Sequence, residues 1–158
     1  MKVVLVRHAH AGSREAWGGD DRDRPLSAKG ERQAAFLVPV LSGFAPGRIL
    51  SSPAVRCLQT VAPTATLVGR DVEPVEALAE GHADEAVALV ERLTGGTVVV
   101  CTHGDVASAL LEACRTGPVI GPPIHMGKAE VRLLRRRSGA WTAEGPFSLS
   151  GEVAPPVA

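Results

Sequence analysis

Two short aliphatic runs, far apart along the chain, dominate the pattern of hydrophobic and polar positions. They cover residues 3–6 and 98–100, and both consist largely of valine. Unbroken apolar runs of this length are typical of strands buried on both faces, as at the centre of a parallel sheet. Both lead into histidine, because Arg7 and His8 follow the first run and His103 lies just beyond the second. The pattern therefore predicts two central strands with polar side chains at their carboxyl ends.

Helical periodicity alternates with these runs and with weaker strand signals. Ser27 is expected to cap a helix in which Pro39 causes a kink or ends the regular part early. Ser52 and Pro53 predict the cap and first turn of a second helix. Because strand and helix alternate, the pattern predicts an α/β fold with a mainly parallel sheet and helices on both faces. Two further helices are expected at residues 86–93 and 106–113, and weaker strands at residues 48–51, 72–75, 129–134 and 140–147.

Length, charge and cysteine usage narrow the class of protein. The 158 residues are about the length of one domain, predicted over residues 1–150, with a flexible tail at residues 151–158. Basic and acidic residues balance at 17 each, which argues against nucleic acid or an anionic membrane as a partner. Three cysteines without paired spacing, no secretory signal and no apolar run of about 20 residues indicate a cytoplasmic protein.

A phosphate site can be assembled from the predicted strand ends. If the two central strands are neighbours, His8 and His103 face one crevice at the carboxyl edge of the sheet, where open α/β folds bind ligands. Arg7 lies at the same edge, and Arg56 falls in the first turn of the predicted second helix. Guanidinium groups match phosphoryl oxygens, and the amino ends of helices add N–H donors. These residues predict a phosphate-binding pocket that contains an imidazole.

Four motifs follow one another along the chain: residues 5–11 (LVRHAHA), 24–27 (RPLS) with Gly30, 51–60 (SSPAVRCLQT) and 100–104 (VCTHG). In this order they resemble the motifs of the histidine phosphatase superfamily, which has the phosphoglycerate-mutase-like fold. The resemblance implies a three-layer α/β/α sandwich and spans about residues 2–135. Among family members, the chain is most similar to the short SixA-like phosphohistidine phosphatases and to histidine phosphatase domains fused to Nudix domains. One departure is Ala9, where the commonest signature has glycine.

The resemblance also implies a role for each candidate residue. His8 is the implied nucleophile that becomes phosphorylated, while Arg7, Arg56 and His103 hold the phosphoryl group. Glu80 is the candidate proton donor to the leaving group. No metal or other cofactor is implied, because the arginines supply the positive charge. The expected function is that of a metal-independent phosphatase, acting on protein phosphohistidine or on a small phosphorylated metabolite or nucleotide.

The sequence leaves four points open. Glu76, Asp84 and Glu85 lie close to Glu80 in the sequence and are alternative proton donors. The same motifs also fit a catalytically silent phosphate-binding module that partners a separate nucleotide hydrolase. Neither the leaving group nor the oligomeric state follows from the sequence.

The spacing of residues bears on three competing classes of protein: cysteine phosphatases, P-loop proteins and metallohydrolases. The positions six residues beyond the three cysteines hold no arginine, which a cysteine phosphatase requires. Residues 121–128 resemble a P-loop but are one residue too long, and Ala129 stands where a hydroxyl is needed. His8 and His10, together with the aspartates at 20, 21 and 23, leave a metallohydrolase as a minor alternative. The cysteines Cys57, Cys101 and Cys114 are interpreted as reduced, packed thiols.

Overall fold

The computed structural model describes residues 1–115 and 122–147, which form one mixed sheet between two layers of helices. The turn-rich segment predicted at 117–123 falls largely outside the described residues, and so does the tail predicted at 151–158. The strands are β1 (Lys2–Arg7), β2 (Arg48–Ser51), β3 (Val72–Pro74), β4 (Thr97–Thr102), β5 (Val131–Arg137) and β6 (Ala140–Phe147). The helices are α1 (Ala28–Gly43), α2 (Val55–Val68), α3 (Ala83–Arg92) and α4 (Gly104–Ala113), with short 3-10 helices η1 (Asp21–Asp23) and η2 (Glu76–Leu78).

The sheet places the two valine-rich strands side by side at its centre. The strand order is β3-β2-β4-β1-β5-β6, and the first four of these strands are parallel. β5 runs antiparallel to β1 and forms a hairpin with β6. Arg7 pairs with Thr102 across β1 and β4, so both strands end at the same level. The predicted mainly parallel sheet and the terminal hairpin are therefore confirmed.

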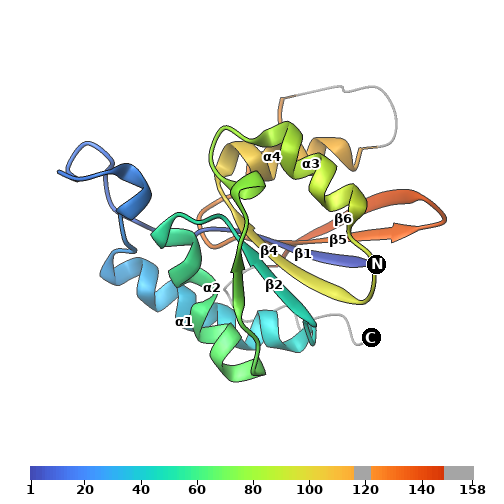
Figure 1. Ribbon diagram of the computed structural model, residues 1–158, viewed down its shortest axis with the longest axis horizontal. Coiled ribbons are helices and arrows are strands. Elements are labelled where there is room, and N and C mark those ends of the chain that lie inside the picture. Colours follow the sequence, from blue (N-terminus) through green and yellow to red (C-terminus); the bar gives the residue numbers. More distant parts are fainter. Residues whose placement is uncertain (116–121, 148–158) are drawn as a thin grey trace.

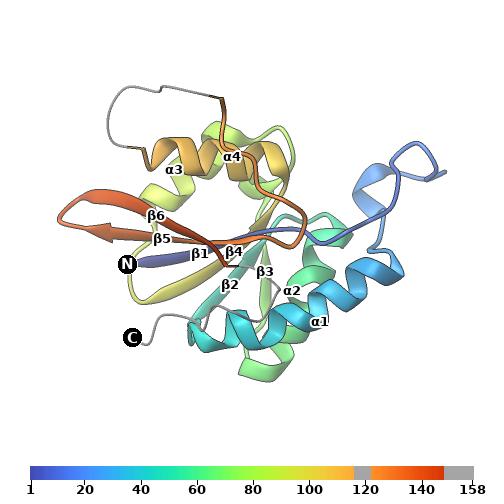
Figure 2. The same cartoon turned by 180° about the vertical axis from the view of Figure 1, so that it is seen from behind.

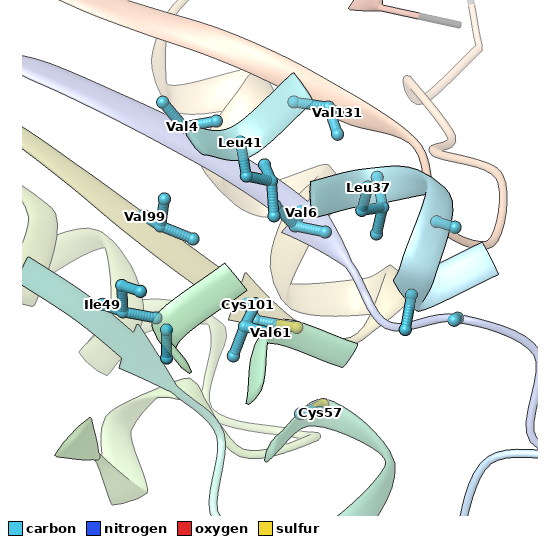
Figure 3. Packing of buried hydrophobic residues seen from close by; sticks show 14 of the residues in the cluster. Val4, Val6, Leu37, Leu41, Ile49, Cys57, Val61, Val99, Cys101 and Val131 are labelled. Carbon is cyan, nitrogen blue, oxygen red and sulfur yellow. The ribbon is translucent and has the colours of Figure 1, made fainter. Parts of the chain in front are cut away.

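Helices cover both faces of the sheet, as the alternation of elements predicts. α1 and α2 lie on one face, and α3 and α4 lie on the other (Figures 1 and 2). Val4 and Val6 point toward α1 and α2, in the cluster that Figure 3 shows, whereas Val3 and Leu5 point into the second cluster. Burying a side chain of this size contributes roughly 1.5–3 kcal/mol. β1 is thus packed against helices on both faces, which holds the residues at its carboxyl end in place.

One predicted detail of the helices is wrong. α2 begins at Val55 with Ala54 at its N-cap, rather than at Pro53 with Ser52 as the cap. The Ser52 hydroxyl instead accepts a hydrogen bond from the Ala54 N–H at 3.2 Å, and its oxygen also bonds a histidine ring described below. Pro39 lies inside α1, which continues to Gly43. This proline is exposed, so the carbonyl that loses its N–H partner faces solvent.

The chain that leaves β1 is fastened directly to the start of α1. Ser27 caps this helix as predicted, its hydroxyl accepting from the Gly30 N–H at 3.1 Å, and its own N–H donates to the His10 carbonyl oxygen at 3.0 Å. A Cβ atom on Gly30 would lie 1.9 Å from that same carbonyl oxygen. Glycine is therefore required for the helix to approach this closely, which fixes the path of the backbone past His8.

Within the described ranges, no helix combines the length and the apolar character needed to cross a membrane. The cytoplasmic location that the sequence indicates stays a prediction.

Candidate active site

The structure brings His8 and His103 together at the carboxyl edge of the sheet. His8 follows β1 and His103 follows β4, and their ring centroids lie 5.3 Å apart with the rings at 66°. The backbone N–H of His8 donates to the Thr102 carbonyl oxygen at 3.0 Å, which links the two strand ends. The two histidines are only 3% and 2% exposed. The sheet thus fixes two buried imidazoles edge to face.

The hydrogen bonds of His8 define which of its ring nitrogens can react. Its Nδ1 lies 2.8 Å from the Ala9 carbonyl oxygen, and because a carbonyl can only accept, Nδ1 carries the proton. Nε2 therefore keeps its lone pair. Burial lowers the pKa of His8 to about 2, and the positive charge of Lys128 acts in the same direction. The imidazole is neutral at physiological pH, as a nitrogen nucleophile must be.

His103 is held in the opposite tautomer. Its Nδ1 lies 3.4 Å from Nη2 of Arg56, which can only donate, and its Nε2 lies 2.8 Å from the Ser52 hydroxyl oxygen. Nε2 of His103 therefore carries the proton and donates to Ser52. The thiol of Cys57 lies 3.6 Å from the same nitrogen. Arg56, Ser52 and Cys57 together fix the orientation of this ring.

Arg7 reaches across the edge of the sheet toward the first turn of α4. Its Nη1 donates to the Met126 carbonyl oxygen at 2.5 Å. A Cβ atom on Gly104 would lie 2.9 Å from the guanidinium carbon of Arg7, so the glycine after His103 makes room for this side chain. Among the described residues, the buried Nε of Arg7 has no hydrogen-bond partner. A buried donor of this kind suits an anionic ligand.

Arg56 projects from the first turn of α2 and is only 2% exposed. Its Nη1 donates to the Asp21 carbonyl oxygen at 2.6 Å, and its Nη2 donates to the Asp21 carboxylate at 3.0 Å. Hydrogen bonds and charge from Arg24, Arg56 and Arg14 hold the pKa of Asp21 below its ordinary value, against the opposing effect of burial. As for Arg7, the described residues provide no partner for the buried Nε of Arg56.

Glu80 lines a pocket of about 200 Å³ beside His103 and Arg56. Both of its carboxylate oxygens accept from Nη2 of Arg14 at 2.9 Å, and one lies 3.7 Å from Nη2 of Arg56. Of the alternative acids, Glu76 also lines the pocket and pairs with Arg22, whereas Asp84 and Glu85 lie outside it. The structure thus places Glu80 at the mouth of the site, within an ion pair.

Sequence reasoning missed Lys128. Its Nζ lies 3.3 Å from Nε2 of His8, although the two residues are 120 positions apart in the chain. Neither His8 nor Lys128 lines the neighbouring pocket, but the buried His8 ring lies against His103, which does line it. Burial lowers the pKa of Lys128 to about 8, and the charges of Arg7, Arg24 and Arg56 add to the effect.

The metal-ligand candidates and the cysteines complete the set of residues considered from the sequence. His10, considered as a metal ligand with His8, has its Nδ1 2.6 Å from the Ser27 hydroxyl. Over residues 1–115 and 122–147, no group of His, Cys, Asp or Glu side chains is arranged to hold a metal ion. Cys57 and Cys101 are buried free thiols, and Cys114 is a partly buried one.

Comparison with known proteins agrees with this fold and these motifs. Residues 3–87 match the model of the histidine phosphatase superfamily (branch 1), and the chain belongs to that family. An 8-oxo-(d)GTP phosphatase from Mycolicibacterium smegmatis is 38% identical over 117 residues, which are 70% of this chain and 36% of the relative. The chain thus spans about a third of the length of the curated relatives it matches.

Solved structures of two phosphatases share the fold over almost the whole chain. The protein histidine phosphatase SixA, in complex with tungstate, superimposes with a TM-score of 0.80 and 22% identity, covering 94% of this chain and 97% of that one. A mycobacterial glucosyl-3-phosphoglycerate phosphatase gives a TM-score of 0.73 with 20% identity, covering 90% and 96%. At this level of identity the likeness establishes the phosphoglycerate-mutase-like α/β fold that the motifs imply.

Proposed function

We propose that this protein is a phosphatase that works through a phosphohistidine intermediate at His8. The observation that carries the proposal is the state of the His8 side chain. The ring is buried and neutral, and its Nδ1–H donates to the Ala9 carbonyl oxygen, so that Nε2 keeps its lone pair. His103 and Arg56 lie beside it in the same cluster. Membership of the histidine phosphatase superfamily supports the same conclusion.

The proposed reaction consists of two displacements at phosphorus. In the first, the lone pair of His8 Nε2 forms a P–N bond while the bond from phosphorus to the leaving group breaks, and the leaving group takes the electron pair and a proton. In the second, water attacks phosphorus, the P–N bond breaks, its electron pair returns to Nε2, and the proton that the water loses restores the acid that protonated the leaving group. The hydrogen bond from Nδ1–H to the Ala9 carbonyl helps the ring to carry positive charge while it is phosphorylated.

Positive groups around the imidazole are proposed to stabilise the charge on the three equatorial oxygens. Arg7 and Arg56 each offer a buried Nε–H that has no partner among the described residues. His103 can add its Nε2–H, which donates to Ser52 in the free protein. Phosphoryl transfer requires mainly positioning and charge stabilisation, which fixed guanidinium groups provide. On this proposal the reaction needs no metal or other cofactor.

Glu80 is the proposed proton donor to the leaving group. Its place in the pocket beside His103 and Arg56 supports the role. Because both of its oxygens accept from Arg14, this ion pair must open before the carboxyl group can deliver a proton. We therefore expect the fastest turnover for substrates whose leaving groups need little help from an acid.

The proposed substrate is a protein phosphohistidine or a small phosphorylated metabolite or nucleotide. A pocket of about 200 Å³, rimmed by charged side chains, suits a phosphorylated group with polar surroundings. The relatives point to different members of this set, since one is named for 8-oxo-(d)GTP and another for protein histidine phosphatase activity. Turnover measured in parallel on a phosphohistidine peptide, sugar phosphates and nucleotides distinguishes them.

Trapping of the intermediate tests the proposal. Brief incubation with a ³²P-labelled substrate, followed by rapid quenching, is expected to give a label that is stable in alkali and lost in acid. His8→Ala should take up no label, whereas His125→Gln, at an exposed histidine, should be labelled like the wild type. If the wild type neither takes up label nor turns over aryl phosphate, phosphohistidine peptide or nucleotide, the chain is instead a silent phosphate-binding module.

A further inference from the structure

Lys128 occupies the space in front of the nucleophilic nitrogen. Its Nζ is 3.3 Å from Nε2 of His8, and an ammonium group has only hydrogens to offer, so it donates to the lone pair that would attack phosphorus. A substrate cannot approach that nitrogen while the ammonium group lies there. Lys128 must therefore move whenever the proposed reaction starts.

The backbone around Lys128 is fixed, although its side chain is exposed. The next residue, Ala129, is 1% exposed, and its N–H lies 3.1 Å from the Arg7 carbonyl oxygen and 3.3 Å from that of His8. Ala129 also has a φ of 57°, a left-handed conformation that alanine rarely adopts. The segment before β5 is thus pinned against the end of β1, and only the long Lys128 side chain is free to swing.

Electrostatics gives the ammonium group a reason to move. In the free protein burial lowers the pKa of Lys128 to about 8, and the positive charges of Arg7, Arg24 and Arg56 add to this effect. A phosphoryl group brings negative charge to this place and attracts an ammonium ion strongly at short range. The charged and titratable groups that face it are Arg7, Arg24, Arg56, Cys57 and His8.

We propose that Lys128 is a further catalytic residue of this site: its ammonium group covers Nε2 of His8 in the free protein and transfers to a phosphoryl oxygen when substrate arrives. The inference rests on the proposed function. The first position keeps the imidazole unprotonated and shielded from other electrophiles. The second adds a mobile cation to the fixed charges of Arg7 and Arg56 in the transition state.

Three variants test this role by steady-state kinetics with an aryl phosphate. Lys128→Met is expected to lower kcat/KM by about 10- to 100-fold, in the range found when a single charge-stabilising donor is removed. Lys128→Arg should lose less, because its guanidinium group still reaches a phosphoryl oxygen. Lys29→Met, at an exposed lysine in the first turn of α1, is the matched control and should behave as the wild type.

The pH profile provides a readout that a merely structural role would not change. Wild-type kcat/KM should fall on the alkaline side as Lys128 loses its proton, with a midpoint near its pKa of about 8. In Lys128→Arg this alkaline limb should disappear, because the guanidinium group stays charged. An unchanged kcat/KM in Lys128→Met, or an alkaline limb that survives in both variants, overturns the role of Lys128.

Binding of inorganic phosphate separates this inference from the proposed function. Calorimetry should give Lys128→Met about 10-fold weaker phosphate binding than wild type, with Lys29→Met unchanged. If wild type takes up label on His8 but Lys128→Met equals it in rate and phosphate affinity, only the role of Lys128 fails. If wild type takes up no label, the proposed function fails, and the phosphate affinities alone then decide whether Lys128 is a ligand of the bound anion.

Discussion

The buried neutral state of His8 predicts a measurable dependence of stability on pH. In the folded protein, burial lowers the pKa of His8 from 6.5 to about 2, whereas in the unfolded chain water surrounds the ring and restores its ordinary value. Below pH 6.5 the unfolded state therefore binds a proton that the folded state does not. Stability must fall as the pH falls through this window, by about 1.4 kcal/mol per pH unit.

The effect can be isolated by replacing His8 with glutamine, which does not titrate. Between about pH 8.5 and about pH 4.5, the wild type should lose about 2.7 kcal/mol of unfolding free energy that His8→Gln keeps. His8 is only 3% exposed, so solvent screening should reduce this value little. The other titratable groups are common to the two proteins, so the difference in slope reports the His8 imidazole together with its coupling to Lys128 and His103.

Urea denaturation at a series of pH values measures this difference directly. Well above pH 6.5 the free energies of unfolding of wild type and His8→Gln should differ by a constant offset. As the pH falls below 6.5, the wild type should lose stability relative to His8→Gln. His125→Gln, at an exposed position, is the control and should keep the wild-type slope. An offset between wild type and His8→Gln that does not change with pH would refute the argument, because it would mean that the folded state protonates His8 as readily as the unfolded chain.

Three further predictions address the remaining parts of the site. Gly104→Ala should lower kcat/KM by about 10-fold or more without unfolding the protein, because the added Cβ would lie 2.9 Å from the guanidinium carbon of Arg7. Gly96→Ala is the kinetic control, since a Cβ there would have no atom within 4 Å. Glu80→Gln should slow hydrolysis of alkyl phosphates by about 10²-fold or more while affecting activated aryl phosphates little, and equal losses on both would contradict its role as acid. Activity should survive excess EDTA, since arginine side chains supply the charge at the phosphoryl site, and loss that added Mg²⁺ restores would contradict this.

The fold and the meeting of the two histidines could be predicted because they depend on short, strongly patterned segments. Valine-rich runs identify β1 and β4 as central strands, and parallel neighbours end at one edge of a sheet. His8 and His103 follow those strands directly, so their position follows from the topology. Arg56 could be placed as well, because the first turn of a helix after a neighbouring strand opens on the same edge.

Lys128 could not be predicted in the same way, although a signal for it exists. Lys128 precedes β5, whereas His8 and His103 follow strands. The start of β5 lies beside the end of β1 because the two strands are antiparallel. The terminal hairpin was predicted, but its partner in the sheet was not, so the start of β5 could not be placed beside His8. Ser52 was misplaced for a related reason: the Ser-Pro pair resembles a helix cap, while its hydroxyl in fact bonds His103. The loop contacts of Asp21 and Arg14 follow no periodic pattern and required the structure.

The atom that carries the phosphoryl group is the most direct test of the whole account. The trapped protein, enriched in ¹⁵N histidine and examined by ³¹P and ¹⁵N NMR before the intermediate decays, reveals both the residue and the ring nitrogen that are modified. Because Nδ1 of His8 donates to the Ala9 carbonyl and Nε2 faces the cationic groups, the account predicts a single phosphoryl group on Nε2 of His8. A phosphoryl group on Nδ1, on His103 or on a serine or cysteine, formed at the rate of turnover, would contradict it.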